Sequence, residues 1–190
     1  MLTPDFVKTK FEQALPYDEY VASGQLHEQD NWKNQYERVA FTDQQAKLLG
    51  SFERQVNALF VSGTWCGDCV QQMPIVGKIA AASNGRVNAR FLDKDKNMDL
   101  ADHLKICGGH RVPVGVLLNE DFDVLALVGD RLLSKYRLMA EANLGGACPM
   151  PGAPIPDNEI AAVTQDYVDQ FERAHLICRL STKLRQRYGD

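Results

Sequence analysis

Residues 56–69 read VNALFVSGTWCGDC and join a short apolar run to a pair of cysteines. The run that begins at Val56 has the length and the continuous apolar character of a buried β-strand, and a Ser-Gly pair ends it. Residues 67–83 favour a helix, which an Asn-Gly pair ends. The two cysteines, Cys66 and Cys69, are therefore predicted at the point where a strand passes into a helix.

This placement suits thiol–disulfide chemistry. The first thiol would lie beside unpaired backbone N–H groups and the positive end of the helix dipole, both of which favour its thiolate form. Because only the thiolate is an effective nucleophile, the pattern predicts Cys66 as the attacking sulfur and Cys69 as a partly shielded resolving sulfur. Zinc sites use the same spacing, but they need a second pair of ligands, and the other cysteines and histidines of the chain stand singly. We therefore interpret the pair as a redox site and expect no metal.

Further strands and helices follow on the C-terminal side of this stretch. Apolar runs predict strands at 87–92, 113–118 and 122–128, and the last two runs have the spacing of an antiparallel hairpin. Helices are expected near 98–107 and at 132–143. The central order is therefore β-α-β-α-β-β-α, which belongs to the α/β class.

The N-terminal part of the chain has a different pattern of polar and apolar residues. Residues 1–53 are polar, with apolar residues at helical spacing and no visible strand pattern. Thr42 favours the start of a short helix, and Gly50 favours its end. This part is expected to be a helical extension of the central domain.

The C-terminal part begins with a proline-rich segment. Four prolines within 148–156 exclude regular structure there, so an extended connector is expected. A single helix is predicted from residue 157 to about residue 187. The sequence thus divides into an N-terminal helical extension, 1–53, a central domain, 54–144, and a connector with a C-terminal helix that packs on the domain, 145–190.

Composition and charge limit the classes of function. The chain has 190 residues, of which 45% are hydrophobic and 24% are charged, and its net charge is −4. The acidic and basic residues are interspersed, so no surface for nucleic acid or membrane is expected. The N-terminus does not resemble a signal peptide, and no apolar stretch reaches the length that spans a bilayer. A cytoplasmic protein with mostly reduced thiols is expected.

Residues 65–69, Trp-Cys-Gly-Asp-Cys, resemble the active-site signature of the thioredoxin superfamily, Trp-Cys-Gly-Pro-Cys. Pro74 falls where family members carry a proline that kinks the active-site helix, and Val112-Pro113 is similar to the family's cis-proline dipeptide. The resemblance covers residues 54 to 143. It implies a thioredoxin-like fold with a mixed four-stranded central sheet, here flanked by helical extensions.

The resemblance also implies roles for single residues. Beside the two cysteines, the residues that would shape the site or bind substrate are Trp65, Gly67, Asp68, Val112 and Pro113. Family geometry would place Pro113 against the two sulfurs and leave the backbone of Val112 free to pair with an extended substrate segment. The family's chemistry uses the Cys66–Cys69 disulfide itself and requires no other cofactor.

Two residues depart from the family pattern. Phe60 stands where thioredoxins usually carry a buried Asp, and an apolar ring cannot help to remove the proton of the resolving thiol, so slower resolution is expected. Asp68 replaces the proline between the cysteines. Its negative charge is expected to raise the pKa of the neighbouring thiol relative to a neutral residue and to favour a reducing couple.

Four further residues bear on the site. Arg111, next to Val112, could contact a substrate carboxylate, although a solvated arginine is the more common outcome for a loop. Cys148 could relay electrons to or from Cys66. Cys107 and Cys178 have apolar neighbours and are expected to be buried.

Residues and resemblance together predict a thiol–disulfide oxidoreductase that reduces protein or small-molecule disulfides through the Cys66/Cys69 dithiol. Its expected partners are a protein or small-thiol substrate that contains a disulfide, and an upstream reductase or thiol that restores the dithiol. An alternative from another class is a binding module or scaffold of the same fold whose dithiol is weak or vestigial.

Overall fold

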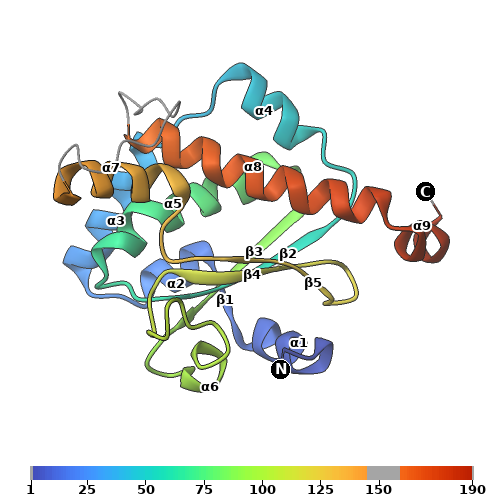
Figure 1. The fold of residues 1–190 in the computed structure, drawn as a ribbon, viewed down its shortest axis with the longest axis horizontal. Coiled ribbons are helices and arrows are strands. Elements are labelled where there is room, and N and C mark those ends of the chain that lie inside the picture. The colour runs from blue at the N-terminus through green and yellow to red at the C-terminus, as the bar shows by residue number, and fades with distance from the viewer. Residues whose placement is uncertain (1, 145–158, 190) are drawn as a thin grey trace.

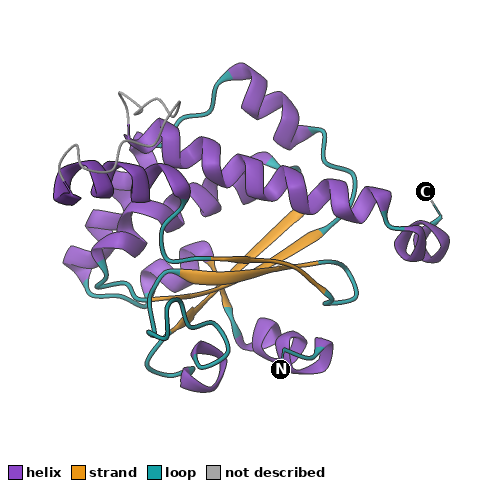
Figure 2. Cartoon of the chain, in the orientation of Figure 1, coloured by secondary structure: helices purple, strands orange, loops and turns teal. Residues whose placement is uncertain are grey.

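The computed structural model describes residues 2–144 and 159–189, and its centre is a five-stranded sheet flanked by helices (Figures 1 and 2). The strand order is β1-β3-β2-β4-β5. The strands are β1 (Leu15–Pro16), β2 (Val56–Ser62), β3 (Val87–Asp93), β4 (Val114–Leu118) and β5 (Val124–Val128). β2 and β3 are parallel, and the other neighbouring pairs are antiparallel. The prediction of a mixed sheet in an α/β fold is confirmed.

The sheet has one strand more than expected. β1 lies in the N-terminal part, where no strand was predicted, and Leu15 and Pro16 pair with Phe91 and Arg90 of β3. Two residues are too short to show an alternating pattern. Proline is accepted in this position because β1 is an edge strand.

The helices form layers on both faces of the sheet. They are α1 (Pro4–Gln13), α2 (Tyr17–Ala22), α3 (Leu26–Arg38), α4 (Asp43–Gly50), α5 (Gly67–Ala82), α6 (Met98–Ala101), α7 (Leu133–Leu144), α8 (Glu159–Leu180) and α9 (Thr182–Tyr188). Figure 1 shows α3, α4, α5, α7 and α8 above the sheet and α1 and α6 below it. No helix among these residues has the length and apolar character needed to cross a membrane.

Two predicted helices differ in length from the observed ones. The helix expected near 98–107 ends at Ala101. It could not extend to residue 107 in any case, because Cys107 and Gly108 adopt positive φ angles of 50° and 74°, which a right-handed helix cannot contain. The helix expected from 157 to about 187 is interrupted at Ser181. This serine caps α9, where its hydroxyl accepts a hydrogen bond from the Leu184 N–H at 3.4 Å.

The start of α4 follows the prediction. Thr42 accepts a hydrogen bond from the Gln45 N–H at 3.2 Å, and the Gln45 side chain accepts one from the Thr42 N–H at 2.8 Å. This reciprocal pair is a capping box, which satisfies N–H groups that the helix leaves unpaired.

The two faces of β2 belong to different cores. Ala58 and Phe60 point to the side of α5 and α8, whereas Leu59 and Val61 point to the side of α1 and α6. Every residue of β2 is buried because strands flank it on both sides and helices cover both faces. This explains why most of its residues are apolar on both faces instead of alternating, with Asn57 and Ser62 as the polar exceptions.

The helices α2, α3 and α4 share the larger of these cores. Tyr20 of α2, Trp32 of α3 and Leu49 of α4 are buried in the same cluster as Phe91 of β3. The Tyr20 and Phe91 rings are stacked at 5.6 Å. The folded sheet therefore depends on side chains that precede residue 53.

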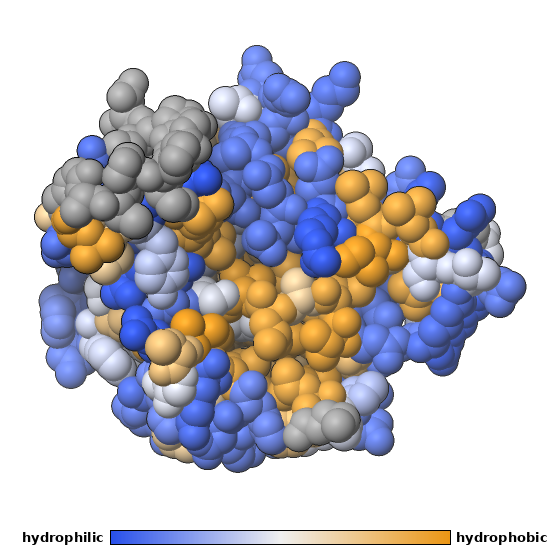
Figure 3. Space-filling model, viewed as in Figure 1, coloured by the Kyte–Doolittle hydropathy of each residue, from blue (hydrophilic) through white to orange (hydrophobic). Residues whose placement is uncertain are grey.

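Apolar side chains also reach the surface at the opposite edge of the sheet. The strand β5 exposes Val124 and Leu127, and α8 exposes Leu176 and Leu180. Figure 3 shows apolar residues gathered on this side of the molecule, over β5 and the C-terminal half of α8. The exposure of β5 reflects its position as an edge strand, in contrast to the covered strand β2.

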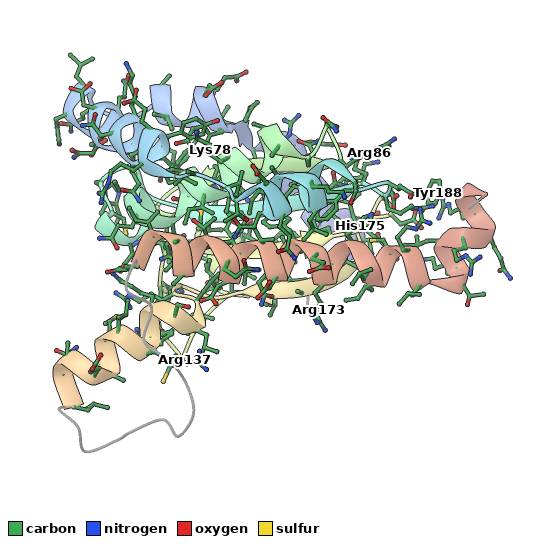
Figure 4. The ribbon with its side chains drawn as sticks, turned by 90° about the horizontal axis from the view of Figure 1, so that it is seen from above. Lys78, Arg86, Arg137, Arg173, His175 and Tyr188 are labelled. Carbon is green, nitrogen blue, oxygen red and sulfur yellow. The ribbon has the colours of Figure 1, made fainter. Side chains whose placement is uncertain are left out.

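The surroundings of His175 in α8 predict that the protein loses stability in mild acid. Its ring stacks on Phe52 at 4.4 Å, and its Nε2 accepts hydrogen bonds from the backbone N–H groups of Glu53 at 2.9 Å and Arg54 at 3.3 Å, so the ring must be neutral (Figure 4). Burial lowers the pKa of His175, against the opposing charge of Glu120.

The stabilising contribution of His175 is present above its unfolded pKa of about 6.5 and is lost as the pH falls below that value, by at most about 1.4 kcal/mol per pH unit. Urea unfolding at a series of pH values would measure this. His175→Gln keeps an acceptor at the same place without titrating, so its unfolding free energy should fall less in mild acid. Equal pH dependence of the two proteins would contradict the prediction.

Candidate active site

Cys66 lies at the junction of β2 and α5, as the sequence predicted. It is the residue that precedes the first turn of α5, and its carbonyl accepts a hydrogen bond from the Val70 N–H at 2.9 Å. Its side chain is half-buried, whereas Cys69, one turn further along α5, is fully buried. Both thiols are free. One sulfur is thus accessible and the other is shielded.

The Val112–Pro113 dipeptide lies next to Cys66. Its peptide bond is cis, and Pro113 directly precedes β4. The Cys66 Sγ is 3.7 Å from the Val112 carbonyl oxygen. Since β4 pairs with β2, the start of β4 and the end of β2 meet at this point of the sheet, with Val61 opposite Val114. The sheet therefore brings together two segments that are 46 residues apart in sequence.

Local hydrogen bonds separate the acidities of the two thiols. A hydrogen bond from the Cys69 thiol lowers the pKa of Cys66 to about 6, and the backbone N–H groups of Cys69 and Asp68 act in the same direction. Burial and the charge of Asp68 oppose this shift. Burial raises the pKa of Cys69. At neutral pH Cys66 therefore favours the thiolate form while Cys69 keeps its proton.

Asp68 has the effect on Cys66 that the sequence predicted, but the other groups outweigh it. Its carboxylate also has a partner, Arg131, which the sequence analysis did not identify. Arg131 donates to Asp68 through Nε at 3.2 Å and through Nη2. Arg131 in turn donates through Nη1 to Asp130 at 3.3 Å.

A signal for this neighbourhood is present in the sequence. The hairpin of β4 and β5 pairs Gly115 with Val128, so the residues that follow β5 lie beside those that precede β4. Asp130 and Arg131 are two charged residues in that position. The predicted hairpin is a signal that these two residues lie near Pro113, but it does not show which groups they contact.

Phe60 is buried below the dithiol, where it packs against the backbone of β4. A Cβ atom added to Gly115 would lie 2.5 Å from the Phe60 ring, which explains why glycine occupies that position. The buried hydroxyl of Ser62 lies on the Cys69 side and lowers the pKa of this thiol against the effect of burial.

Trp65 and Gly67 lie at the surface around the dithiol. The Trp65 side chain is 54% exposed, and the Lys94 Nζ lies 5.3 Å from the centre of its ring. A side chain at Gly67 would meet no atom within 4 Å, so the space in front of the first helical turn is open. The surface beside Cys66 is therefore open at Gly67.

The other candidate residues from the sequence, Arg111 and the three remaining cysteines, differ in their exposure and contacts. Arg111 donates to Asp130 at 3.3 Å and is partly exposed. Cys178 is buried as expected, but the prediction for Cys107 was wrong: it is exposed, because it lies in a turn and not in a helix. Cys148 lies outside the described residues.

No group of three or more histidine, cysteine or acidic residues that could hold a metal ion lies in the ranges 2–144 and 159–189. Thus Cys66 and Cys69 have no further metal ligand among the residues described. The expectation that the site uses its own disulfide and no other cofactor stays a prediction.

Comparison with known proteins points to one family. The family model described as thioredoxin matches residues 14–138. A protein of unknown function from Pseudomonas aeruginosa is similar in structure, with a TM-score of 0.66, 14% identity, and coverage of 87% of this chain and 93% of that one. An HIV epitope scaffold is similar with a TM-score of 0.57 and 17% identity, over 87% and 90% of the two chains. These two likenesses concern the fold.

Proposed function

This chain belongs to the thioredoxin family, and we propose that it is a thiol–disulfide oxidoreductase that reduces protein or small-molecule disulfides. The observation that carries the proposal is the pairing of a half-buried Cys66 with a buried Cys69 at the start of α5, next to Val112-Pro113. Such a pair suits disulfide exchange, because one thiol is ionised and accessible for the first step while the other stays protonated until the second step.

In the first step the Cys66 thiolate attacks one sulfur of the substrate disulfide. An S–S bond forms between Cys66 and that sulfur, the substrate S–S bond breaks, and the second substrate sulfur leaves as a thiolate that takes up a proton. The open space in front of Gly67 and the exposed Trp65 leave room for the substrate, and the Val112 backbone offers hydrogen-bonding groups to an extended segment.

In the second step Cys69 loses its proton and attacks the Cys66 sulfur. The bond between Cys66 and the substrate breaks, the second substrate thiol leaves, and the protein retains a Cys66–Cys69 disulfide. Two electrons have passed from the protein to the substrate. A reductase or a low-molecular-weight thiol must then return them, which fits a reducing compartment such as the cytoplasm.

The balance of charges around Cys66 supports the reducing direction. Stabilisation of the thiolate makes a couple more oxidising, and strong oxidants of this fold have a first cysteine with a pKa of about 3.5. The pKa of Cys66 lies well above that value, and the charge of Asp68 contributes to the difference. We therefore propose a reductant.

The proposal predicts a fixed stoichiometry of thiols. The reduced protein is mixed, in the absence of oxygen, with insulin whose disulfides are intact. The protein should lose two thiols and the insulin should gain two. Peptide mapping should then find Cys66 joined to Cys69. Equilibration with glutathione should give a reduction potential below about −220 mV.

A folded protein that loses no thiols would refute the oxidoreductase and favour a binding module. A potential near that of periplasmic oxidants, about −120 mV, would refute the reducing direction alone.

A further inference from the structure

The loop between β5 and α7 adds two charged residues to the dithiol region. The pairing of Gly115 with Val128 places this loop beside the start of β4, and therefore beside Pro113. Asp130 and Arg131 lie in the loop, and both contact residues of other elements. None of these contacts belongs to the exchange steps described above.

Arg131 holds the carboxylate of Asp68 at two points. Its Nε donates to Oδ1 at 3.2 Å and its Nη2 donates to Oδ2, so the planar guanidinium faces the carboxylate edge to edge. Both side chains are largely withdrawn from solvent, with exposed fractions of 21% and 24%. A two-point pair in such a place is more specific and less screened than a surface ion pair.

Arg131 is itself held by a buried acidic residue. The Asp130 side chain is 3% exposed and accepts hydrogen bonds from Arg131 and Arg111, each at 3.3 Å, and from the Tyr136 hydroxyl at 2.6 Å. The Gln72 side chain of α5 donates to the Asp130 carbonyl at 2.8 Å. The guanidinium is thus fixed in place before it meets Asp68.

We propose that Arg131 is a positioning residue for the attacking sulfur: it holds the Asp68 carboxylate in place and compensates the negative charge that Asp68 brings next to Cys66. This inference deepens the proposed function and rests on Cys66 as the nucleophile. An aspartate between two cysteines would otherwise oppose the formation of a thiolate beside it.

The surroundings of Cys66 support this assignment. The charge of Asp68 raises the pKa of Cys66, so a cation bound to that carboxylate weakens the effect. Besides Asp68, the ionisable side chains that interact electrostatically with the dithiol include Tyr20 from α2 and Tyr167 from α8, and Arg111 lies next to Val112. Of the described cations, Arg131 is the one with a recorded hydrogen bond to Asp68.

A double-mutant cycle tests the inference. The rate at which iodoacetamide alkylates Cys66 is measured against pH in a background in which Cys107, which is exposed, and Cys148, which lies outside the described residues, are both replaced by Ser. Arg131→Ala should raise the apparent pKa of Cys66 by on the order of one unit. Asp68→Asn should lower it, and adding Arg131→Ala to Asp68→Asn should change it no further.

Two more variants keep the test decisive. Arg173→Ala removes the same charge from an exposed position on α8 and should leave the pKa of Cys66 unchanged (Figure 4). Arg131→Lys keeps the charge but loses the two-point geometry, so it should give a smaller rise in the pKa. It also serves as the test variant if Arg131→Ala does not fold.

The inference is overturned if Arg131→Ala and Arg173→Ala give the same pKa for Cys66. It is also overturned if the effect of Arg131→Ala persists in the Asp68→Asn background, because Arg131 would then act on Cys66 by its own charge or through the packing of its loop, and not through Asp68. Alkylation needs no disulfide substrate. A protein that fails to reduce insulin but shows the expected cycle would therefore refute the proposed function and leave the role of Arg131 intact.

Discussion

Cys66→Ser is expected to lower the reduction of insulin disulfides to the background of the assay. A serine hydroxyl does not ionise at neutral pH, so the variant has no nucleophile at the accessible end of α5, and Cys69 is too deeply buried to replace it. The substitution changes one half-buried atom, so the unfolding free energy should change little. Turnover and urea unfolding measured on the same preparation would separate the two effects.

The matched variants are Cys69→Ser and Cys107→Ser. Cys69→Ser keeps the attacking thiolate but cannot release the substrate, so it should accumulate a mixed disulfide between Cys66 and the substrate, visible by mass spectrometry and lost on reduction. Cys107→Ser removes an exposed cysteine outside the dithiol and should retain full turnover. Turnover by Cys66→Ser comparable with that of Cys107→Ser would show that the exchange proceeds elsewhere in the chain.

Much of the fold could be predicted because its signals are local. The run from Val56 to Val61 is apolar except for Asn57, since helices cover both faces of the strand, and Gly63, Gly85 and Pro113 fall near the ends of elements. The short strand at Leu15–Pro16 had no such signal, because its pairing with β3 is decided by tertiary contacts. The same holds for the turn at Cys107, whose apolar neighbours suggested a helix.

The site was predictable only in part for a similar reason. Cys66 and Cys69 are close in sequence, and their chemistry can be inferred from spacing and from the strand-to-helix junction. Arg131 lies 63 residues beyond Asp68 and meets it only because β4 and β5 pair in one particular register. The effect of the Asp68 charge on Cys66 could therefore be predicted from the sequence, but the compensation of this charge by Arg131 could not.

Trp32→Ala is expected to destabilise the protein by about 3–5 kcal/mol, the cost typical of removing a buried tryptophan. Trp32 of α3 is fully buried, and its ring contacts Tyr17 at 5.9 Å and Tyr20 at 5.6 Å between centroids. Urea unfolding would measure the loss. A change below about 1 kcal/mol would mean that the helices before residue 53 are not part of the cooperative fold.

Trp32 also connects these helices to the dithiol. Its Nε1 donates to the Thr64 carbonyl at 2.9 Å, and the Thr64 hydroxyl donates to Glu28 of α3 at 2.9 Å. Thr64 precedes Trp65 and Cys66, so α3 holds the backbone that presents the attacking sulfur. Trp32→Phe keeps most of the buried ring but leaves the Thr64 carbonyl without this donor, at a cost of about 1–3 kcal/mol.

Trp32→Phe should therefore alter the alkylation rate of Cys66 while the protein remains folded. Tyr36→Phe is the matched control, since it changes an aromatic residue of the same helix that contacts Tyr17 and has no recorded hydrogen bond to residues 64–66. If both variants leave the reactivity of Cys66 unchanged, α3 contributes only to stability. If Trp32→Phe alone changes it, α3 is a functional part of the proposed site, because the position of the Cys66 thiol depends on this helix.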